Sequence, residues 1–207
     1  MARGQAAAGR EGAGSDKVSS PRFFLAAPEG LAAAQVIACV TAACEAGDVA
    51  SLLVPASVAK DVTAAAQELG VAVMVSGEAR DAARAGADGI QVEANTDDVV
   101  AAREQVGKDR FIGAHAGGSR HFAMEAAEAG ADYIAFDQKA ASIGGEPIIR
   151  WWSDMMEIPC VAFTPVEPED LDILLPQKPD FIRPSEAMWQ GPEEARRIVS
   201  TLSQRLG

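Results

Sequence analysis

The chain has 207 residues, of which 48% are hydrophobic, and its 30 acidic and 18 basic side chains give a net charge of −12. This length suits one domain, and the apolar share is enough for a large core. Because Lys and Arg form no basic stripe, we expect neither nucleic acid nor an acidic membrane surface as a partner. The three cysteines lack the close spacing of zinc or redox motifs, which is typical of a reduced cytoplasmic protein.

The chain begins with a segment that differs from the rest in composition. Residues 1–20 are rich in Gly, Ala and Ser and lack the continuous apolar stretch of a signal peptide. We expect residues 1–20 to be a disordered tail and residues 21–207 to form one domain.

From residue 22 onward, apolar runs alternate with Ala-rich segments of helical periodicity such as 58–69, 97–106 and 192–206. Eight of the runs have the length and composition of buried strands. In chain order they cover residues 22–28, 50–56, 71–77, 89–94, 110–116, 133–139, 159–166 and 180–186.

One helix-to-strand connection occurs twice with similar sequences, "AARAGADGIQVE" and "AAEAGADYIAFD". Gly86 and Gly130 are typical of the residue that ends a helix in a left-handed conformation, and Asp88 and Asp132 then open the strands. Apolar strands that alternate with helices favour parallel pairing. Eight such units predict a single (βα)8 TIM barrel of the α/β class, with the repeated joints on its bottom face.

In such a barrel, function resides at the carboxyl ends of the strands. Polar side chains collect there, although any strand that runs into solvent also ends in polar residues. The candidates are Ser76, Glu78, Glu93, Asn95, His115, Asp137, Gln138, Lys139, Thr164, Arg183 and Ser185.

Four segments in order, "GADGIQVEANTDD", "RFIGAHAGG", "AGADYIAFD" and "IPCVAFTPVEPED", resemble the thiamine phosphate synthase superfamily, which includes the TenI-like thiazole tautomerases. The resemblance covers nearly the whole chain after the tail. It implies a (βα)8 barrel that binds phosphorylated thiamine precursors, with Mg²⁺ and pyrophosphate in the synthases.

The chain departs from this pattern where the family binds diphosphate. The Gln, Arg and Lys that the resemblance implies at the end of strand two are replaced by Ser51, Leu53 and Pro55. The implied Asp and Arg after strand three are replaced by Gly77 and Glu78. The resemblance implies that these cations neutralise a diphosphate leaving group and that this Asp binds the metal.

The later loops depart as well. Thr96 stands where the family has an Asp, with Asp97 next to it, and Thr164 and Pro165 replace a Gly-Gly pair. Only Ser185 is kept by position in the phosphate loop after strand eight. We therefore expect no thiamine phosphate synthesis and no metal site, even though the resemblance implies Mg²⁺.

His115 is the strongest catalytic candidate, because an imidazole suits proton transfer at carbon and tautomerase-like relatives place a His about two positions away. Its alternative role is a hydrogen bond to a neighbouring loop. Asp137 and Lys139 complete the predicted catalytic set, but they share one side of their strand and can instead form a structural pair.

The predicted ligand-binding residues are Glu93, Asn95, Thr164, Arg183 and Ser185. Arg183 supplies a fixed positive charge, and the Gly pairs of "HAGGSRH" and "ASIGGEP" can present N–H groups to an anion or serve as ordinary turns. A small phosphorylated ligand is the expected partner.

Adjacent Trp151 and Trp152 cannot both bury in the same way on one helix. One fits the core, and the other, with Met155 or Met156, is a candidate homodimer surface.

Two functions remain open at this level. The first is an enzyme of the thiamine pathway or a neighbouring one, of the transferase or isomerase type, that acts on a phosphorylated heterocycle through His115. The second is a non-catalytic barrel that binds a ligand or a partner protein after its active site decayed.

Overall fold

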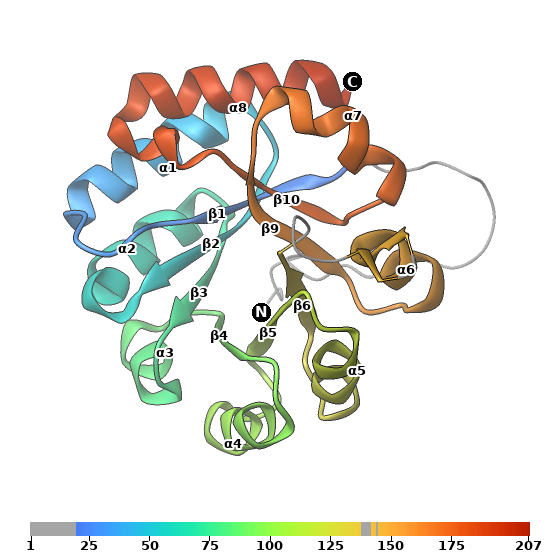
Figure 1. Cartoon of the computed structure of the whole chain (residues 1–207). Helices are drawn as coiled ribbons and strands as arrows, with labels where there is room; N and C mark the ends of the chain where they lie inside the picture. The colour runs from blue at the N-terminus through green and yellow to red at the C-terminus, as the bar shows by residue number, and fades with distance from the viewer. Residues whose placement is uncertain (1–19, 138–141, 144) are drawn as a thin grey trace.

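The computed structural model describes residues 20–137, 142–143 and 145–207. Eight parallel strands close into a barrel in the order β1-β10-β9-β6-β5-β4-β3-β2 (Figure 1). The (βα)8 prediction is therefore confirmed. The barrel strands are β1 (Arg22–Ala26), β2 (Val49–Pro55), β3 (Ala72–Ser76), β4 (Gly89–Glu93), β5 (Phe111–Gly117), β6 (Tyr133–Phe136), β9 (Cys160–Val166) and β10 (Phe181–Pro184).

Helices surround the barrel on its outer side (Figure 1), as right-handed crossovers between parallel strands require. They are α1 (Ala33–Ala46), α2 (Ala56–Glu68), α3 (Ala79–Ala85), α4 (Thr96–Val106), α5 (Arg120–Glu128), α6 (Ile148–Met155), α7 (Leu171–Leu174) and α8 (Pro192–Leu206). Helix α8 packs beside α1 and so closes the ring next to the first strand. None of the helices in the described part of the chain is long and apolar enough to cross a membrane.

The core has two layers because each barrel strand buries both of its faces. Outward strand side chains such as Leu52 and Ile112 pack with helix side chains such as Trp152 of α6 in one large cluster. Inward side chains, among them Phe24, Met74 and Tyr133, fill the barrel itself in a second cluster. The Tyr133 hydroxyl donates to Gln91 Oε1 at 2.9 Å, which satisfies the polar end of this buried ring. The interior of the barrel is therefore packed with side chains at the level of these residues.

The repeated helix-to-strand joint has a physical function in the barrel. Asp88 Oδ2 accepts a hydrogen bond from Val73 N, and Asp132 Oδ2 accepts one from Ile112 N, each at 2.7 Å. Asp180 makes the same bond to Cys160 N at 2.9 Å. Each Asp thus binds the start of the neighbouring strand and satisfies an N–H that precedes the regular ladder. Glycine precedes the first two because the chain turns there through positive φ, for example 69° at Gly86.

The structure contains a small two-stranded sheet that the sequence did not predict. Strands β7 (Ser142–Ile143) and β8 (Glu146–Pro147) pair antiparallel between β6 and α6. Pro147 is the N-cap of α6. The predicted tail, apart from Ser20, and the candidates Gln138 and Lys139 lie outside the described residues.

The two adjacent tryptophans separate as the helical geometry requires. Trp152 is fully buried and donates its indole N–H to Ile158 O at 2.7 Å. Trp151 is half-buried, with the Arg120 guanidinium 4.5 Å above its ring. Met155 on the same helix is 69% exposed. A homodimer through this surface stays a prediction.

Candidate active site

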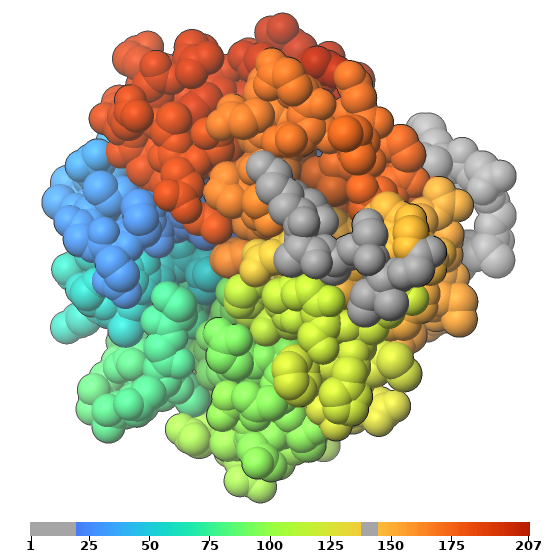
Figure 2. Space-filling model, in the orientation of Figure 1, coloured from blue at the N-terminus to red at the C-terminus, as the bar shows by residue number. Residues whose placement is uncertain are grey.

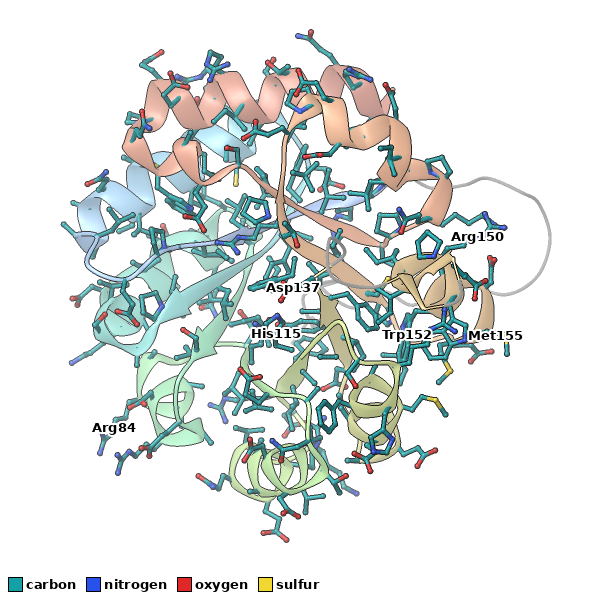
Figure 3. The ribbon with its side chains drawn as sticks, in the orientation of Figure 1. Arg84, His115, Asp137, Arg150, Trp152 and Met155 are labelled. Atoms are coloured by element: carbon teal, nitrogen blue, oxygen red, sulfur yellow. The ribbon has the colours of Figure 1, made fainter. Side chains whose placement is uncertain are left out.

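Three of the predicted site residues, Glu93, His115 and Asp137, lie at the carboxyl ends of the neighbouring strands β4, β5 and β6. The ladders pair Glu93 on β4 with His115 on β5, and His115 with Ala135 on β6. Asp137 follows two residues after Ala135 and so points to the same side of its strand. Figure 3 shows the side chains of His115 and Asp137 next to each other near the centre of the barrel.

His115 lies between two carboxylates. Its Nε2 is 3.2 Å from Asp137 Oδ2, and its Nδ1 is 3.9 Å from Glu93 Oε1. The first distance is a hydrogen bond, whereas the second exceeds hydrogen-bond range. A carboxylate can only accept, so Nε2 carries the proton toward Asp137 and Nδ1 of the neutral ring keeps its lone pair. The Glu93 side chain is 76% exposed and can move without opening the core.

Arg183 supplies positive charge next to Phe163, whose ring also contacts His115. The Phe163 ring centroid lies 5.1 Å from the His115 ring and 4.8 Å from Arg183 Cζ. Arg183 also donates to Phe163 O at 3.3 Å and to Glu186 Oε1 at 2.8 Å. Burial lowers the pKa of Arg183, while the charges of Glu186 and Asp137 oppose this shift. The guanidinium remains charged at any physiological pH.

The other three predicted ligand-binding residues have structural surroundings of their own. Asn95 caps α4, because its Oδ1 accepts from Asp98 N at 2.9 Å and its Nδ2 donates to Asp98 Oδ2. Thr164 is half-buried beside Phe163 on β9. Ser185 is buried between β10 and the short helix η4 (Glu186–Gln190). A role in ligand binding for Asn95, Thr164 and Ser185 stays a prediction.

A hollow of about 400 Å³ lies outside the barrel between α3 and α4 (Figure 2). Ile90 and Val92 from β4 line it together with Ala101 and Ala102 from α4, and Glu93 lies at its edge. The small side chains of these two helices leave this space open. Glu93 therefore borders both this hollow and the imidazole of His115.

The sequence reasoning missed three residues that shape the site, namely Phe163, Glu186 and Gly117. Strand alternation could have placed Phe163 inward, because it follows the inward Val161 by two residues. The spacing of three between Arg183 and Glu186 could have suggested their ion pair. The conformation of Gly117, with φ of 54°, had no comparable signal in the sequence.

The family model described as thiamine monophosphate synthase matches residues 25–182, from the end of β1 to the middle of β10. The chain belongs to the thiamine monophosphate synthase family. The match ends at Ile182, so Arg183 and Ser185 lie just beyond it.

Curated relatives agree with this family. The chain is 32% identical to the thiamine-phosphate synthase of Rhodospirillum centenum over 199 residues, which are 88% of this chain and 96% of the relative. It is 36% identical to the Hyphomonas neptunium protein of the same name over 70% of both chains. The match to the Erythrobacter litoralis protein has 38% identity but covers 60% of this chain and 63% of that protein.

Solved structures support the fold alone at their low identities. A thiamine phosphate pyrophosphorylase from Pyrococcus furiosus superposes with a TM-score of 0.70 and 21% identity, over 90% of this chain and 95% of that chain. A 3-hexulose-6-phosphate synthase superposes with a TM-score of 0.64 and 13% identity, over 88% and 98%. The second match shows that this barrel shape is shared beyond one activity.

Proposed function

We propose that the barrel binds a small phosphorylated heterocycle at its carboxyl-end mouth and transfers a proton at a carbon atom of this ligand through His115. The position of His115 between Asp137 and Glu93 carries the proposal. Hydrogen bonding to Asp137 orients the ring and leaves Nδ1 as the atom that accepts the proton. The cation formed on the ring then lies between two carboxylates that stabilise it, and the proton returns to another ligand atom.

Arg183 is the proposed anchor for the phosphate. Its side chain is only 14% exposed and is positioned by Phe163, so little freedom is lost when it binds an anion. Binding there would place the ligand beside Phe163, whose ring also contacts His115. The ligand's phosphate would replace Glu186 as the partner of the guanidinium.

Synthesis of thiamine phosphate from a diphosphate is not part of this proposal. Ser51, Leu53 and Pro55 stand where the resemblance implies polar or charged groups, and all three are buried. Ser51 donates its hydroxyl to Ala72 O at 3.1 Å, and Leu53 packs in the inner cluster. None of these side chains can neutralise a leaving diphosphate.

The residues present do not fit the magnesium ion that the family implies. Glu78 is held by Arg80 at 2.8 Å and takes part in the capping box that begins α3. Asp97 lies in the exposed first turn of α4. Within residues 20–137, 142–143 and 145–207, no three His, Cys, Asp or Glu side chains gather as a metal-binding set. We therefore assign no step to a metal.

A second candidate function is a non-catalytic, ligand-binding barrel. One observation favours it: His115 and Arg183, the two groups on which the chemistry depends, each have a carboxylate partner within the protein. Such pairing is also what a purely structural network needs.

Two assays separate these functions. Purified protein is incubated with the pyrimidine diphosphate, thiazole phosphate and Mg²⁺, and thiamine phosphate is sought by mass spectrometry; we expect none. In D₂O, thiazole phosphate should gain deuterium at carbon with the natural protein but not with His115→Gln. Robust thiamine phosphate formation would overturn the proposal. Stabilisation by thiazole phosphate without deuterium uptake would favour the non-catalytic barrel.

A further inference from the structure

The carboxylate that orients His115 stands on a residue outside the regular sheet. The described ladder of β6 ends at Phe136, and Asp137 follows it. The main-chain N–H of Asp137 donates to Gly117 O at 2.9 Å. Gly117 therefore holds the backbone of Asp137 in place.

Gly117 occupies an irregular position on β5. His115 pairs with Ala135, but Gly117 pairs with Phe136, so two residues of β5 oppose one residue of β6. Such a bulge bends its strand and changes the direction of nearby side chains. Gly117 has φ of 54°, in the left-handed region that L residues other than Asn and Asp rarely adopt.

We infer that Gly117 is a positioning residue whose left-handed backbone places the Asp137 carboxylate on His115 Nε2. The reason is geometric: φ of Gly117 sets where its carbonyl points, and this carbonyl binds the N–H of Asp137. This inference rests on the proposed function, since it assigns a device to the same histidine.

Space does not explain the glycine. A Cβ added at Gly117 would meet Asp137 Oδ2 at 3.9 Å, an ordinary van der Waals distance. An alanine would therefore fit in space, and its cost lies in the left-handed φ that an L residue rarely adopts. Relaxation toward negative φ would turn the carbonyl away from Asp137.

The test follows the ring proton of His115 by NMR, in a His121→Gln background that leaves one histidine. A proton held between Nε2 and a carboxylate gives a downfield resonance that exchanges slowly with water. We expect this resonance in the background protein and its loss in Gly117→Ala and in Asp137→Asn.

Two matched variants separate positioning from general strain. Gly86→Ala introduces the same strain at φ of 69°, with nothing within 4 Å of the added Cβ, at a helix end at the bottom of the barrel. It should keep the resonance. Gly117→Asn should keep it too, because Asn tolerates left-handed backbone.

Each outcome bears on the inference. A folded Gly117→Ala that keeps the resonance, or a folded Gly117→Asn that loses it, would overturn the positioning role while leaving the proposed chemistry intact. If Gly117→Ala does not fold, the Asn variant decides alone. Absence of the resonance from the background protein would overturn both the positioning role and the proposed chemistry.

Discussion

His115 Nε2 lies 3.2 Å from Asp137 Oδ2, and the two residues come from adjacent strands and are separated by 22 positions in the chain. In the proposed chemistry this bond fixes the ring so that Nδ1 accepts the proton. Asp137→Asn can present an amide N–H to Nε2 and so favour the wrong tautomer. We expect deuterium uptake by thiazole phosphate to slow by about 10²–10⁴-fold in this variant.

The control for this prediction is ligand affinity. Asp137→Asn should retain the stabilisation by thiazole phosphate in a thermal melt, because Asp137 does not contact the phosphate in the proposal. Unchanged deuterium uptake in the variant would remove Asp137 from the mechanism.

We expect the side chain of Asp132 to stabilise the bottom of the barrel. Its Oδ2 accepts from Ile112 N and from Arg103, both at 2.7 Å. Asp132→Asn replaces a charged acceptor in a partly buried site, so we expect a loss of about 1–3 kcal/mol in the free energy of unfolding. Urea denaturation measures this loss. Asp109→Asn, in an exposed turn on the same face, should change it by less than about 0.5 kcal/mol.

The helix-to-strand connections show which features of the fold could be predicted from the sequence. Gly86 with Asp88 and Gly130 with Asp132 were recognisable as helix-to-strand connections, because glycine and strand propensities act locally. Eight repetitions of strand and helix then left the closed barrel as the simplest arrangement. The bond from each Asp to the neighbouring strand depends on register, which no local pattern contains.

The site was predictable to the level of the strand ends. His115, Glu93 and Arg183 follow from the rule that parallel strands present their last inward residues at one mouth. The bulge at Gly117 does not follow, because it depends on backbone angles in three dimensions, whereas the spacing of three between Arg183 and Glu186 could have suggested their ion pair. We infer that this bulge positions the carboxylate of Asp137 on His115.

Cys44 provides a test of burial around α1. Burial, followed by the charges of Asp48 and Glu45, raises the pKa of the Cys44 thiol to about 11. The folded state favours the neutral thiol, so this contribution to stability is present below pH 9 and declines as the pH rises through 11. We expect Cys44 to react with a disulfide reagent at pH 8 far more slowly in the native protein than in urea. Equal rates in both states would contradict the assignment; Cys39 and Cys160, both buried, should also be slow.

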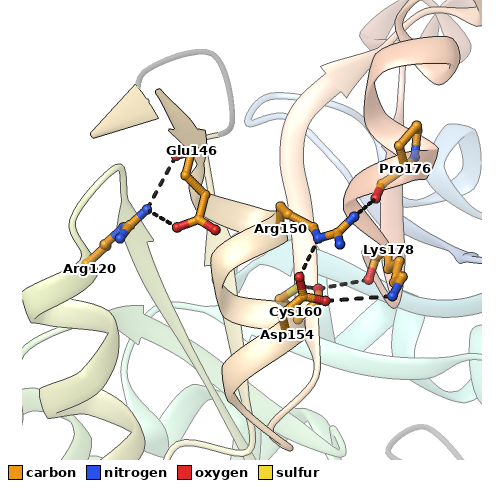
Figure 4. Close-up of polar contacts among 8 residues, drawn as sticks. Arg120, Glu146, Arg150, Asp154, Cys160, Pro176 and Lys178 are labelled. Atoms are coloured by element: carbon orange, nitrogen blue, oxygen red, sulfur yellow. Dashed lines mark hydrogen bonds and ion pairs between the residues drawn. The ribbon is translucent and has the colours of Figure 1, made fainter. Parts of the chain in front are cut away.

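We expect the ion pairs of Asp154 on α6 to make the stability of the protein depend on pH in acid. Arg150 donates to it and also binds Pro176 O at 3.0 Å, while Lys178 lies 3.6 Å away (Figure 4). The hydrogen bond from Arg150 is the main reason that the pKa of Asp154 falls below 3.8, with both cations adding to it. A lowered pKa gives a contribution that is present above pH 3.8 and is lost as the pH falls through the folded value. The melting temperature of Asp154→Asn should thus lie below that of the natural protein at pH 7, and the difference should shrink in acid. As a control, the substitution Asp61→Asn at an exposed position should give a melting-temperature difference that does not change with pH in this way.

Arg183 and Glu186 give a paired prediction for ligand binding. Arg183→Gln removes the proposed phosphate anchor and should weaken binding of thiazole phosphate roughly 10–100-fold, as expected for a charge-assisted hydrogen bond of about 1.5–3 kcal/mol. Glu186→Gln acts in the opposite direction, because it removes the carboxylate that competes for the guanidinium at 2.8 Å. The Glu186 side chain is 60% exposed, so the gain in affinity should be roughly 2–5-fold, the range of an exposed ion pair of about 0.5–1 kcal/mol.

Titration calorimetry with thiazole phosphate and with inorganic phosphate measures both effects. As a control, the non-phosphorylated thiazole alcohol should bind the natural protein and both variants equally. Weaker binding in both variants would mean that the pair is needed intact as a structural unit, and Arg183 would then lose its assignment as the phosphate anchor.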